Sequence, residues 1–385
     1  MVKEKMKQLR VIGQETVWSQ LVSIYKRDKI GNAYLFHGPE GVGKEAMAIK
    51  FASLLNCCQA DEEPCLRCQS CMKFNSLQHS NLTIICPFPI EKKISKNDSP
   101  VKALSPKTVD LLSQLILKKG KDPYFKLKLP RSNSILINSI REIRKKVYLK
   151  NVELGRKMIL IFEADKLMAQ QGQSGNALLK ILEEPPDFTT FVLCTEKPQR
   201  LTETIHSRCQ KIFFPPILDS QIESYLKSEL KISEHEALLI SRLSQGNMMI
   251  ARKLANSDIA DINGVVQSMV SWIASKNENG WRKFLSHVSI NYRANPSDLI
   301  FQFKLLSFWF RDALHDQNSS GNSKYIMSIM GDQIKEFNNM FPNADHTKII
   351  VAIEKFANSL KQNFQLNLVV MNLLIEIRDG LGNSA

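Results

Sequence analysis

Short runs of apolar residues alternate with segments of helical periodicity between residues 33 and 215. The apolar runs have the near-continuous character of buried parallel strands and cover residues 33–38, 82–86, 157–164, 189–195 and 209–215. Helical periodicity follows at 43–56 and at 173–186, where Pro185 and Pro186 stop the second helix. The alternation predicts an α/β domain with a parallel sheet covered by helices.

Beyond Pro216 the pattern becomes helical to the end of the sequence. Three compact helices are expected at 221–230, 234–246 and 248–256, and longer amphipathic segments near 262–290, 296–315, 323–338 and 345–380. A chain of 385 residues exceeds what one hydrophobic core usually spans. We therefore expect three domains: an α/β domain at 1–216, a small helical domain at 217–260 and a helical domain at 261–385.

Between Cys86 and Ile135 the alternation breaks down. The segment is polar, rich in lysine and interrupted by proline, which predicts a loop or mobile insertion over about 87–134, with a short helix near 111–121. The whole chain carries a net charge of +14, and residues 91–157 hold 18 Lys and Arg against 6 Asp and Glu. A basic segment favours polyanionic partners such as nucleic acid, although a solvated, flexible loop explains the same composition.

Cellular location follows from what the sequence does not contain. No run approaches the 18 or more apolar residues of a membrane span, and the first residues, MVKEKMKQLRVIG, lack the apolar stretch of a secretory signal. We expect a cytoplasmic protein without membrane partners.

A glycine-rich turn, GPEGVGK (38–44), follows the first predicted strand and precedes a helix. Gly38, Gly41 and Gly43 allow backbone N–H groups to surround a phosphate, and Lys44 adds positive charge. The next residue is Glu45, where the phosphate-loop (P-loop) motif has the Ser or Thr that binds Mg²⁺. The turn predicts a P-loop fold and leaves open whether ATP or ADP binds.

The strand at 157–164 is expected to occupy the Walker B position, which normally ends in an acidic pair. Phe162 stands where the metal-binding aspartate would be, Glu163 keeps the second position and Asp165 lies two residues further on. We expect a buried strand that ends in a solvated acidic turn. Because both metal-side ligands are missing, the sequence argues against hydrolysis at this pocket.

Cysteines cluster between residues 57 and 71, whereas Cys86, Cys194 and Cys209 are isolated and are expected to be small buried apolar residues. Cys65, Cys68 and Cys71 have the spacing of a structural zinc site, and Cys57 or Cys58 supplies the fourth thiol. We prefer Cys57. The surrounding polar residues exclude a cysteine-rich core, so a zinc module is predicted at 57–75.

Taken in order, GPEGVGK, the cysteine cluster, EADKL, NALLKILEEPP, FVLCTEKPQRL and TIHSRCQ resemble the clamp-loader subunits of bacterial DNA polymerase III. The detailed match covers residues 10–215. It implies a P-loop domain of the AAA+ type with an inserted zinc module, followed by an all-α lid domain and an all-α collar domain that holds five subunits in a ring. Such a ring opens a sliding clamp and places it on primed DNA.

Departures from the family's motifs favour its delta prime subunit over its ATPase subunit, gamma/tau. Glu45, Phe162 and Met249 each stand where gamma/tau has a residue for ATP hydrolysis, Met249 in place of a sensor-2 arginine. The resemblance therefore implies a non-hydrolysing subunit, partnered by gamma/tau and delta subunits. An active gamma/tau-like ATPase and a stand-alone DNA-binding protein on a degenerate AAA+ fold are the alternatives.

Carried over to this sequence, the family's Ser-Arg-Cys motif makes Arg208 an arginine finger, which acts in trans on the ATP held by the adjacent subunit. Ser207 and Cys209 would position it, and Thr195 falls at the sensor-1 position. A guanidinium in this role stabilises the charge that develops on the transferring phosphoryl group.

Overall fold

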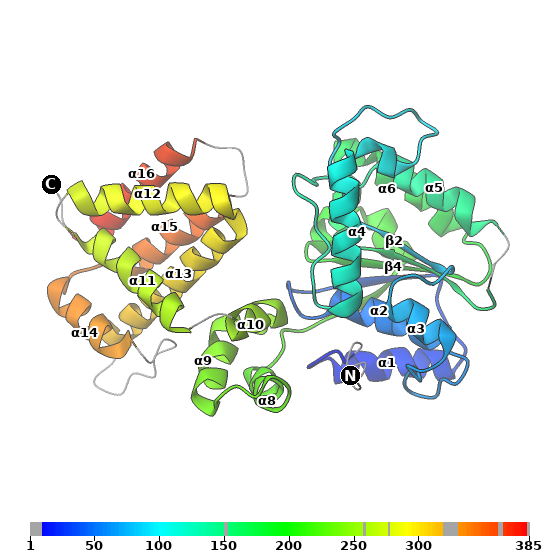
Figure 1. Cartoon of the computed structure of the whole chain (residues 1–385), viewed down its shortest axis with the longest axis horizontal. Coiled ribbons are helices and arrows are strands. Elements are labelled where there is room, and N and C mark those ends of the chain that lie inside the picture. Colours follow the sequence, from blue (N-terminus) through cyan, green and yellow to red (C-terminus); the bar gives the residue numbers. More distant parts are fainter. Residues whose placement is uncertain are drawn as a thin grey trace. The chain divides into compact units, whose positions relative to one another are not determined.

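The computed structural model describes residues 10–149, 153–256, 259–275, 278–318, 330–360 and 365–382 (Figure 1). The chain divides into two compact units. Unit 1 comprises Met1–Tyr225 with Gln245–Met249, and unit 2 comprises Leu226–Ser244 with Ile250–Ala385. Two boundaries between the units fall inside helices, between residues 225 and 226 and between residues 249 and 250. The finer division into three domains stays a prediction.

A five-stranded parallel sheet forms the centre of unit 1, as the apolar runs predict. Its strands are β1 (Ala33–His37), β2 (Leu82–Ile85), β3 (Lys157–Ile161), β4 (Thr189–Thr195) and β5 (Gln210–Phe213), in the spatial order β2-β3-β4-β1-β5. β1 therefore lies between β4 and β5, with Ala33 opposite Phe191 and Tyr34 opposite Gln210. A parallel sheet needs crossover helices on its faces, and these follow nearly every strand.

Helices cover both faces of this sheet (Figure 1). Leu35, Ile159 and Phe191 share one core cluster with Ile140 of α5 (Ile137–Val147) and Ile181 of α6 (Gln173–Glu183). On the other face lie α1 (Glu15–Lys26), α2 (Lys44–Leu55) and α3 (Gln69–Asn75), and Tyr34 packs edge-on against Phe51 of α2. The central strands are buried on both faces, and because successive side chains point to opposite faces, they contribute to two cores.

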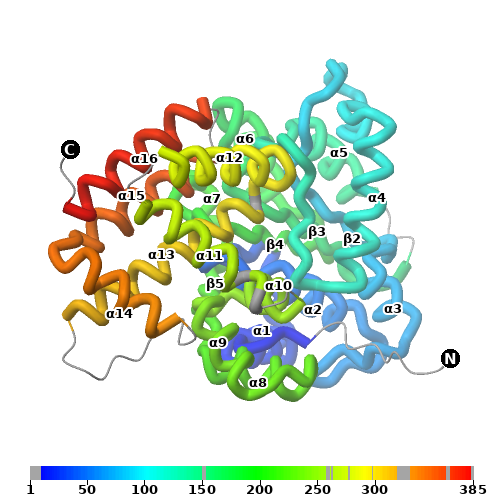
Figure 2. The backbone as a smooth tube through the Cα atoms, turned by 60° about the vertical axis from the view of Figure 1, so that its left-hand side comes forward, coloured from blue at the N-terminus to red at the C-terminus, as the bar shows by residue number. Residues whose placement is uncertain are grey.

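The segment 87–134 is folded, and the expectation of a loop or mobile insertion is wrong. It contains a 3₁₀ turn at Pro100–Ala103 and the 16-residue helix α4 (Pro106–Lys121), which starts at a Ser105 cap and is longer than the expected helix. The two ends of the segment meet at a bridge between Phe88 and Ser134. Figures 1 and 2 show α4 beside the β2 edge of the sheet.

Helices alone follow β5 among the described residues, as predicted. They are α8 (Asp219–Leu230), α9 (Glu234–Ser244), α10 (Met248–Ala255), α11 (Ile259–Ala274), α12 (Glu278–Ala294), α13 (Pro296–Asn318), α14 (Gly331–Met340), α15 (His346–Ser359) and α16 (Leu366–Gly380). Residues 323–329 of the predicted helix at 323–338 lie outside the described residues. Within unit 2, aromatic pairs such as Phe303 with Phe356 and Trp309 with Phe337 hold α13, α14 and α15 together. None of the described helices has the length and apolarity that crossing a bilayer requires.

Candidate nucleotide pocket, metal centre and arginine finger

The predicted pocket residues converge at the carboxyl edge of the sheet. The P-loop follows β1, Glu163 follows β3 and Thr195 ends β4, and these three strands are neighbours. Ligands of open parallel sheets bind at this edge. The sheet order therefore brings together residues that lie far apart in the sequence.

The P-loop has its expected position after β1, and the amine of Lys44 points into the loop. Gly43 caps α2 with a positive φ of 93°. Lys44 is buried, and its Nζ donates to the carbonyl oxygens of Gly38 and Pro39 at 2.8 and 2.5 Å. Burial lowers the pKa of Lys44. The amine thus binds two of the loop's own carbonyls.

Residues of the segment 246–249, where the sequence places Met249 at the sensor-2 position, lie against this loop. The amide of Met248 donates to the Gly41 carbonyl at 3.0 Å. A Cβ on Gly41 would lie 1.8 Å from Oδ1 of Asn247, so only glycine fits at this position.

The Walker B strand ends three residues earlier than expected, at Ile161 instead of residue 164, and the turn after it is largely buried. Phe162 is fully buried, Glu163 has a positive φ of 49°, and Asp165 is only 8% exposed. Thr195 donates its hydroxyl to Asp165 at 2.9 Å. The expected solvated acidic turn is therefore wrong, because these side chains are packed under the loops that follow β3 and β4.

Burial of Glu163 has an electrostatic consequence. Its Oε1 is buried without a hydrogen-bond partner among the described residues, and burial raises the pKa of this carboxyl. A carboxyl in such surroundings favours its neutral form.

Two lysines of the folded insertion enter the pocket, and sequence reasoning missed both. Lys119 of α4 is 1% exposed, and its Nζ lies 2.5 Å from Oε2 of Glu45. Lys126 contacts Glu40 at 2.6 Å and Glu196 at 2.8 Å. The only sequence signal was the surplus of lysine in a segment between two strands, which does not identify partners.

The cysteine cluster forms a compact four-thiol site. Cys57, Cys65, Cys68 and Cys71 bring their Sγ atoms within 4.8 Å of one another, and the pairs 65–71 and 57–68 are 4.0 Å apart. A tetrahedral site with metal–sulfur bonds of about 2.3 Å places its sulfurs about 3.8 Å apart, so these thiols fit such an ion. Cys58 is exposed and lies outside the set. The preference for Cys57 is thus supported.

Backbone amides donate hydrogen bonds to sulfurs of this set. Cys57 Sγ accepts from the amides of Gln59 and Cys65, and Cys68 Sγ accepts from the amide of Cys71. Burial opposes ionisation of Cys68, but the amides of Cys71 and Cys58 lower its pKa to about 6. Thiolates are the form that binds a metal ion.

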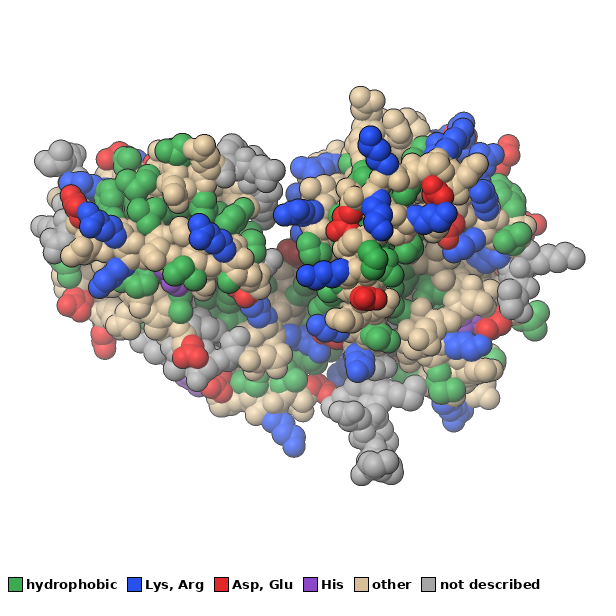
Figure 3. Space-filling model, turned by 45° about the horizontal axis from the view of Figure 1, so that its top comes forward, with side chains coloured by type: hydrophobic (Ala, Val, Ile, Leu, Met, Phe, Trp, Pro, Cys, Tyr) green, Lys and Arg blue, Asp and Glu red, His purple; other side chains and the backbone are tan. Residues whose placement is uncertain are grey.

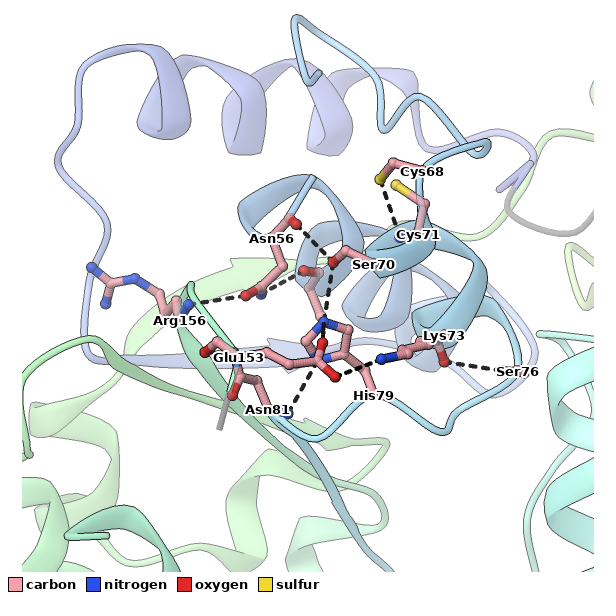
Figure 4. A network of polar contacts seen from close by, with 11 residues as sticks. Asn56, Cys68, Ser70, Cys71, Lys73, Ser76, His79, Asn81, Glu153 and Arg156 are labelled. Atoms are coloured by element: carbon pink, nitrogen blue, oxygen red, sulfur yellow. Dashed lines mark hydrogen bonds and ion pairs between the residues drawn. The ribbon is translucent and has the colours of Figure 1, made fainter. Parts of the chain in front are cut away.

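A serine, a histidine and a glutamate meet beside the metal centre (Figure 4), and sequence reasoning missed them. His79 Nδ1 accepts from the Asn81 amide at 3.1 Å, so its proton lies on Nε2, which faces Ser70 Oγ and Glu153 Oε2 at 3.1 Å each. Ser70 donates to the carbonyl of Asn56 at 2.7 Å. Because Nε2 carries the proton, it cannot activate the serine, and the network is a structural tie between α3 and the start of β2.

Arg208 lies far from the P-loop. It ends α7 (Glu203–Arg208), immediately before β5, and therefore sits at the amino edge of the sheet. Since β1 and β5 are parallel strands of five and four residues, the two edges are separated by roughly 13–16 Å. Arg208 is exposed, with Nη2 2.8 Å from Oε1 of Glu183 and Nη1 3.0 Å from the Thr204 carbonyl.

Together, the sheet order, the glycine-rich turn after β1 and the four thiols define a P-loop α/β protein with a four-cysteine cluster that could hold a metal ion. Residues 13–218, more than half of the chain, match the family model described as "DNA polymerase III, delta subunit", and the protein belongs to this family. It is 24% identical to DNA polymerase III subunit delta' of Bacillus subtilis over 367 residues, which are 95% of this chain and 97% of the relative. The predicted resemblance to the delta prime subunit is thereby confirmed.

The tau and gamma/tau relatives match a smaller part of the chain. DNA polymerase III subunit tau of Bacillus subtilis is 28% identical over 256 residues, which are 65% of this chain and 37% of that protein. Among solved structures, a DNA polymerase III gamma subunit-related protein of Thermotoga maritima superposes with a TM-score of 0.42 at 16% identity, covering 94% of this chain and 99% of that one.

Proposed function

We propose that the protein is a non-catalytic, stator-type subunit of the DNA polymerase III clamp loader, which donates Arg208 to the ATP site of a neighbouring gamma/tau subunit. Its partners would be gamma/tau and delta subunits in a hetero-pentamer, joined through the collar helices of residues 261–385, and the ring would load a sliding clamp onto primed DNA. The delta' relative, similar over nearly its whole length, supports this assignment.

The position of Arg208 carries the proposal. Arg208 and Lys44 lie at opposite edges of the same sheet, so this arginine cannot reach the phosphate site of its own chain. Its guanidinium is exposed, and its ion pair with Glu183 is a surface contact of the kind that contributes little stability. Such an arginine is free to leave Glu183 for a stronger anion presented by another subunit.

The four thiols support a structural zinc ion within the same subunit. Cys57, Cys65, Cys68 and Cys71 would hold it with no ligand position left for substrate, so it would contribute folding energy and no chemistry.

Contact with DNA through the complex is supported by cations that the fold does not pair. Lys96, Arg144 and Lys145 line a surface hollow of about 710 Å³ beside α5, and they are exposed without an ion-pair partner among the described residues. The acidic residues of the same hollow, Asp98 and Glu142, already pair with neighbouring lysines. Figure 3 shows Lys and Arg side chains spread over this part of unit 1. Such a surface suits a phosphate backbone.

The test is ATP hydrolysis by the complex reconstituted with gamma/tau, delta, clamp and primed DNA. In Arg208→Ala, assembly should persist while hydrolysis at the neighbouring gamma/tau site falls by about 10³-fold or more, because a finger of this kind contributes that much. Arg200→Ala is the matched control, since Arg200 is also exposed but follows β4 at the carboxyl edge. Unchanged hydrolysis in Arg208→Ala would refute the role of Arg208 as an arginine finger.

The isolated chain provides the second measurement. A stator should show no Mg²⁺-dependent hydrolysis, whereas turnover abolished by Lys44→Ala would identify a motor subunit. Failure to co-purify with gamma/tau and delta would favour a stand-alone DNA-binding protein.

A further inference from the structure

The folded insertion has no part in the proposed arginine-finger role, yet its most buried cation lies beside the P-loop. Lys119 Nζ is 2.5 Å from the Glu45 carboxylate, 2.8 Å from the Pro123 carbonyl and 5.2 Å from the ring centroid of Phe162. Its side chain is 1% exposed. This ammonium group is thus fixed in place by one carboxylate, one carbonyl and one aromatic face.

The two side chains that flank Lys119 are the two that depart from the P-loop motifs. Position 45 is where the motif has the Mg²⁺-binding hydroxyl, and position 162 is where Walker B has its metal-binding aspartate. A metal ion in an intact site would lie between these two positions. In this protein the Lys119 ammonium group lies between them. A cation that is part of the chain therefore takes the position that a magnesium ion would have in an intact site.

The charge at Glu45 fits this arrangement. A carboxylate next to a P-loop lysine repels a triphosphate, and a buried carboxylate is costly unless a cation pairs with it. Lys119 supplies that cation from within the chain. With the pair formed, Glu45 has no charge left for a metal ion to neutralise.

A second part of the insertion, which includes Tyr124 and Lys126, packs against the P-loop. Tyr124 is 8% exposed, and its hydroxyl accepts the Ile12 amide at 2.8 Å. Its ring is 3.2 Å from where a Cβ on Gly43 would lie, so it fills the space directly beside the phosphate loop. Lys126 neutralises Glu40 of the loop, and although burial opposes its charge, the carboxylates of Glu40 and Glu196 raise its pKa.

We propose that residues 106–126 are an intramolecular substitute for the metal–nucleotide complex, with Lys119 in the place of Mg²⁺ and Tyr124 beside the loop. The segment keeps the P-loop in one closed state that does not depend on ATP, ADP or magnesium. In this closed state Lys44 donates to the carbonyls of Gly38 and Pro39.

The first test measures amine acetylation on the intact wild-type chain, read by mass spectrometry. Lys119 should react far more slowly than Lys118 and Lys121, which are exposed on the same helix and serve as internal controls. Addition of ATP with Mg²⁺ should leave the labelling unchanged. Labelling of Lys119 at the rate of Lys118 would overturn the proposal, as would ATP-dependent exposure of Lys119.

The second test measures binding of ADP and ATP by calorimetry, with and without Mg²⁺. Wild type and Glu45→Thr should both have a Kd above about 1 mM, because the insertion still fills the site in each. Glu45→Thr combined with Lys119→Ala and Tyr124→Ala should bind ADP at least about tenfold more tightly. Tight binding by wild type, or no gain in a triple variant with wild-type circular dichroism, would contradict the proposal.

If the triple variant does not fold, the labelling result decides, because it needs no substitution. Both tests use the isolated chain, whereas the Arg208 test reads hydrolysis on a neighbouring subunit. The insertion proposal and the stator proposal can therefore fail independently.

Discussion

Removal of the Lys119 ammonium should destabilise unit 1 more than any exposed lysine substitution can. Lys119→Met keeps much of the side-chain volume but leaves Glu45, which is 18% exposed, without its counterion, and leaves the Pro123 carbonyl without its donor. Breaking a buried ion pair by removing one partner costs about 3–5 kcal/mol. That cost raises the opening equilibrium of the surrounding helices by about 150-fold to about 5,000-fold, at 1.36 kcal/mol for each factor of ten.

Hydrogen exchange followed by mass spectrometry suits this measurement, because two units need not unfold in a single transition. The exchange of α2 and α4 should accelerate by that factor in Lys119→Met and hardly at all in Lys118→Met. Glu45→Gln combined with Lys119→Met should recover much of the loss, because the double variant leaves no unpaired charge. Equal effects of the Lys119 and Lys118 substitutions, or a coupling energy near zero, would refute the reasoning.

Further expectations concern the metal centre and two buried titratable groups. Cys57→Ser should lower the zinc content of about one per chain, while Cys58→Ser should leave it unchanged; equal loss in both would argue against the assigned ligand set. Burial raises the folded-state pKa of Glu163, so its charge destabilises the fold at neutral pH and this penalty fades as pH falls through that pKa. Glu163→Gln should therefore be more stable than wild type in urea at pH 7, with the difference vanishing near pH 4, and a difference independent of pH would contradict this. Burial lowers the pKa of His346, whose Nε2 lies 2.9 Å from Asn338 Oδ1, so the stability of unit 2 should be intact above the ordinary histidine pKa of about 6.5 and should decline below it. Hydrogen exchange of α15 at pH 7.5 and 5.5 measures this decline, which His346→Gln should reduce.

The strands and the metal site could be predicted because their signals are local. β4 occupies the predicted residues 189–195, and the cysteine spacing identified the four-thiol set with one choice left open. The end of β3 was predicted too late because Phe162 continues the apolar run, although it belongs to the following turn. Apolar character in a sequence does not distinguish a strand from a buried turn.

The insertion was mispredicted for a different reason. Its polar composition suggested a mobile loop, yet Ala103, Leu104, Leu127 and Leu129 are buried, and its ends are joined by a bridge. The apolar residues that anchor it are few and widely spaced, so they form no periodic pattern. Two of its lysines, Lys119 and Lys126, pair with acidic residues about 70 or more positions away. No rule about neighbouring residues can find such partners.

The basic charge of the chain consequently has two distinct uses. Glu40 and Glu45 would make the P-loop unsuitable for phosphate and costly to bury, and Lys126 and Lys119 pair with both. These two lysines therefore contribute nothing to attraction of an outside polyanion, although they belong to the most basic stretch of the sequence. Among the residues that the structure describes, Lys96, Arg144 and Lys145 on the exposed surface around α5 have no ion-pair partner. Burial and pairing, which composition does not reveal, separate the paired lysines beside the P-loop from the exposed cations around α5.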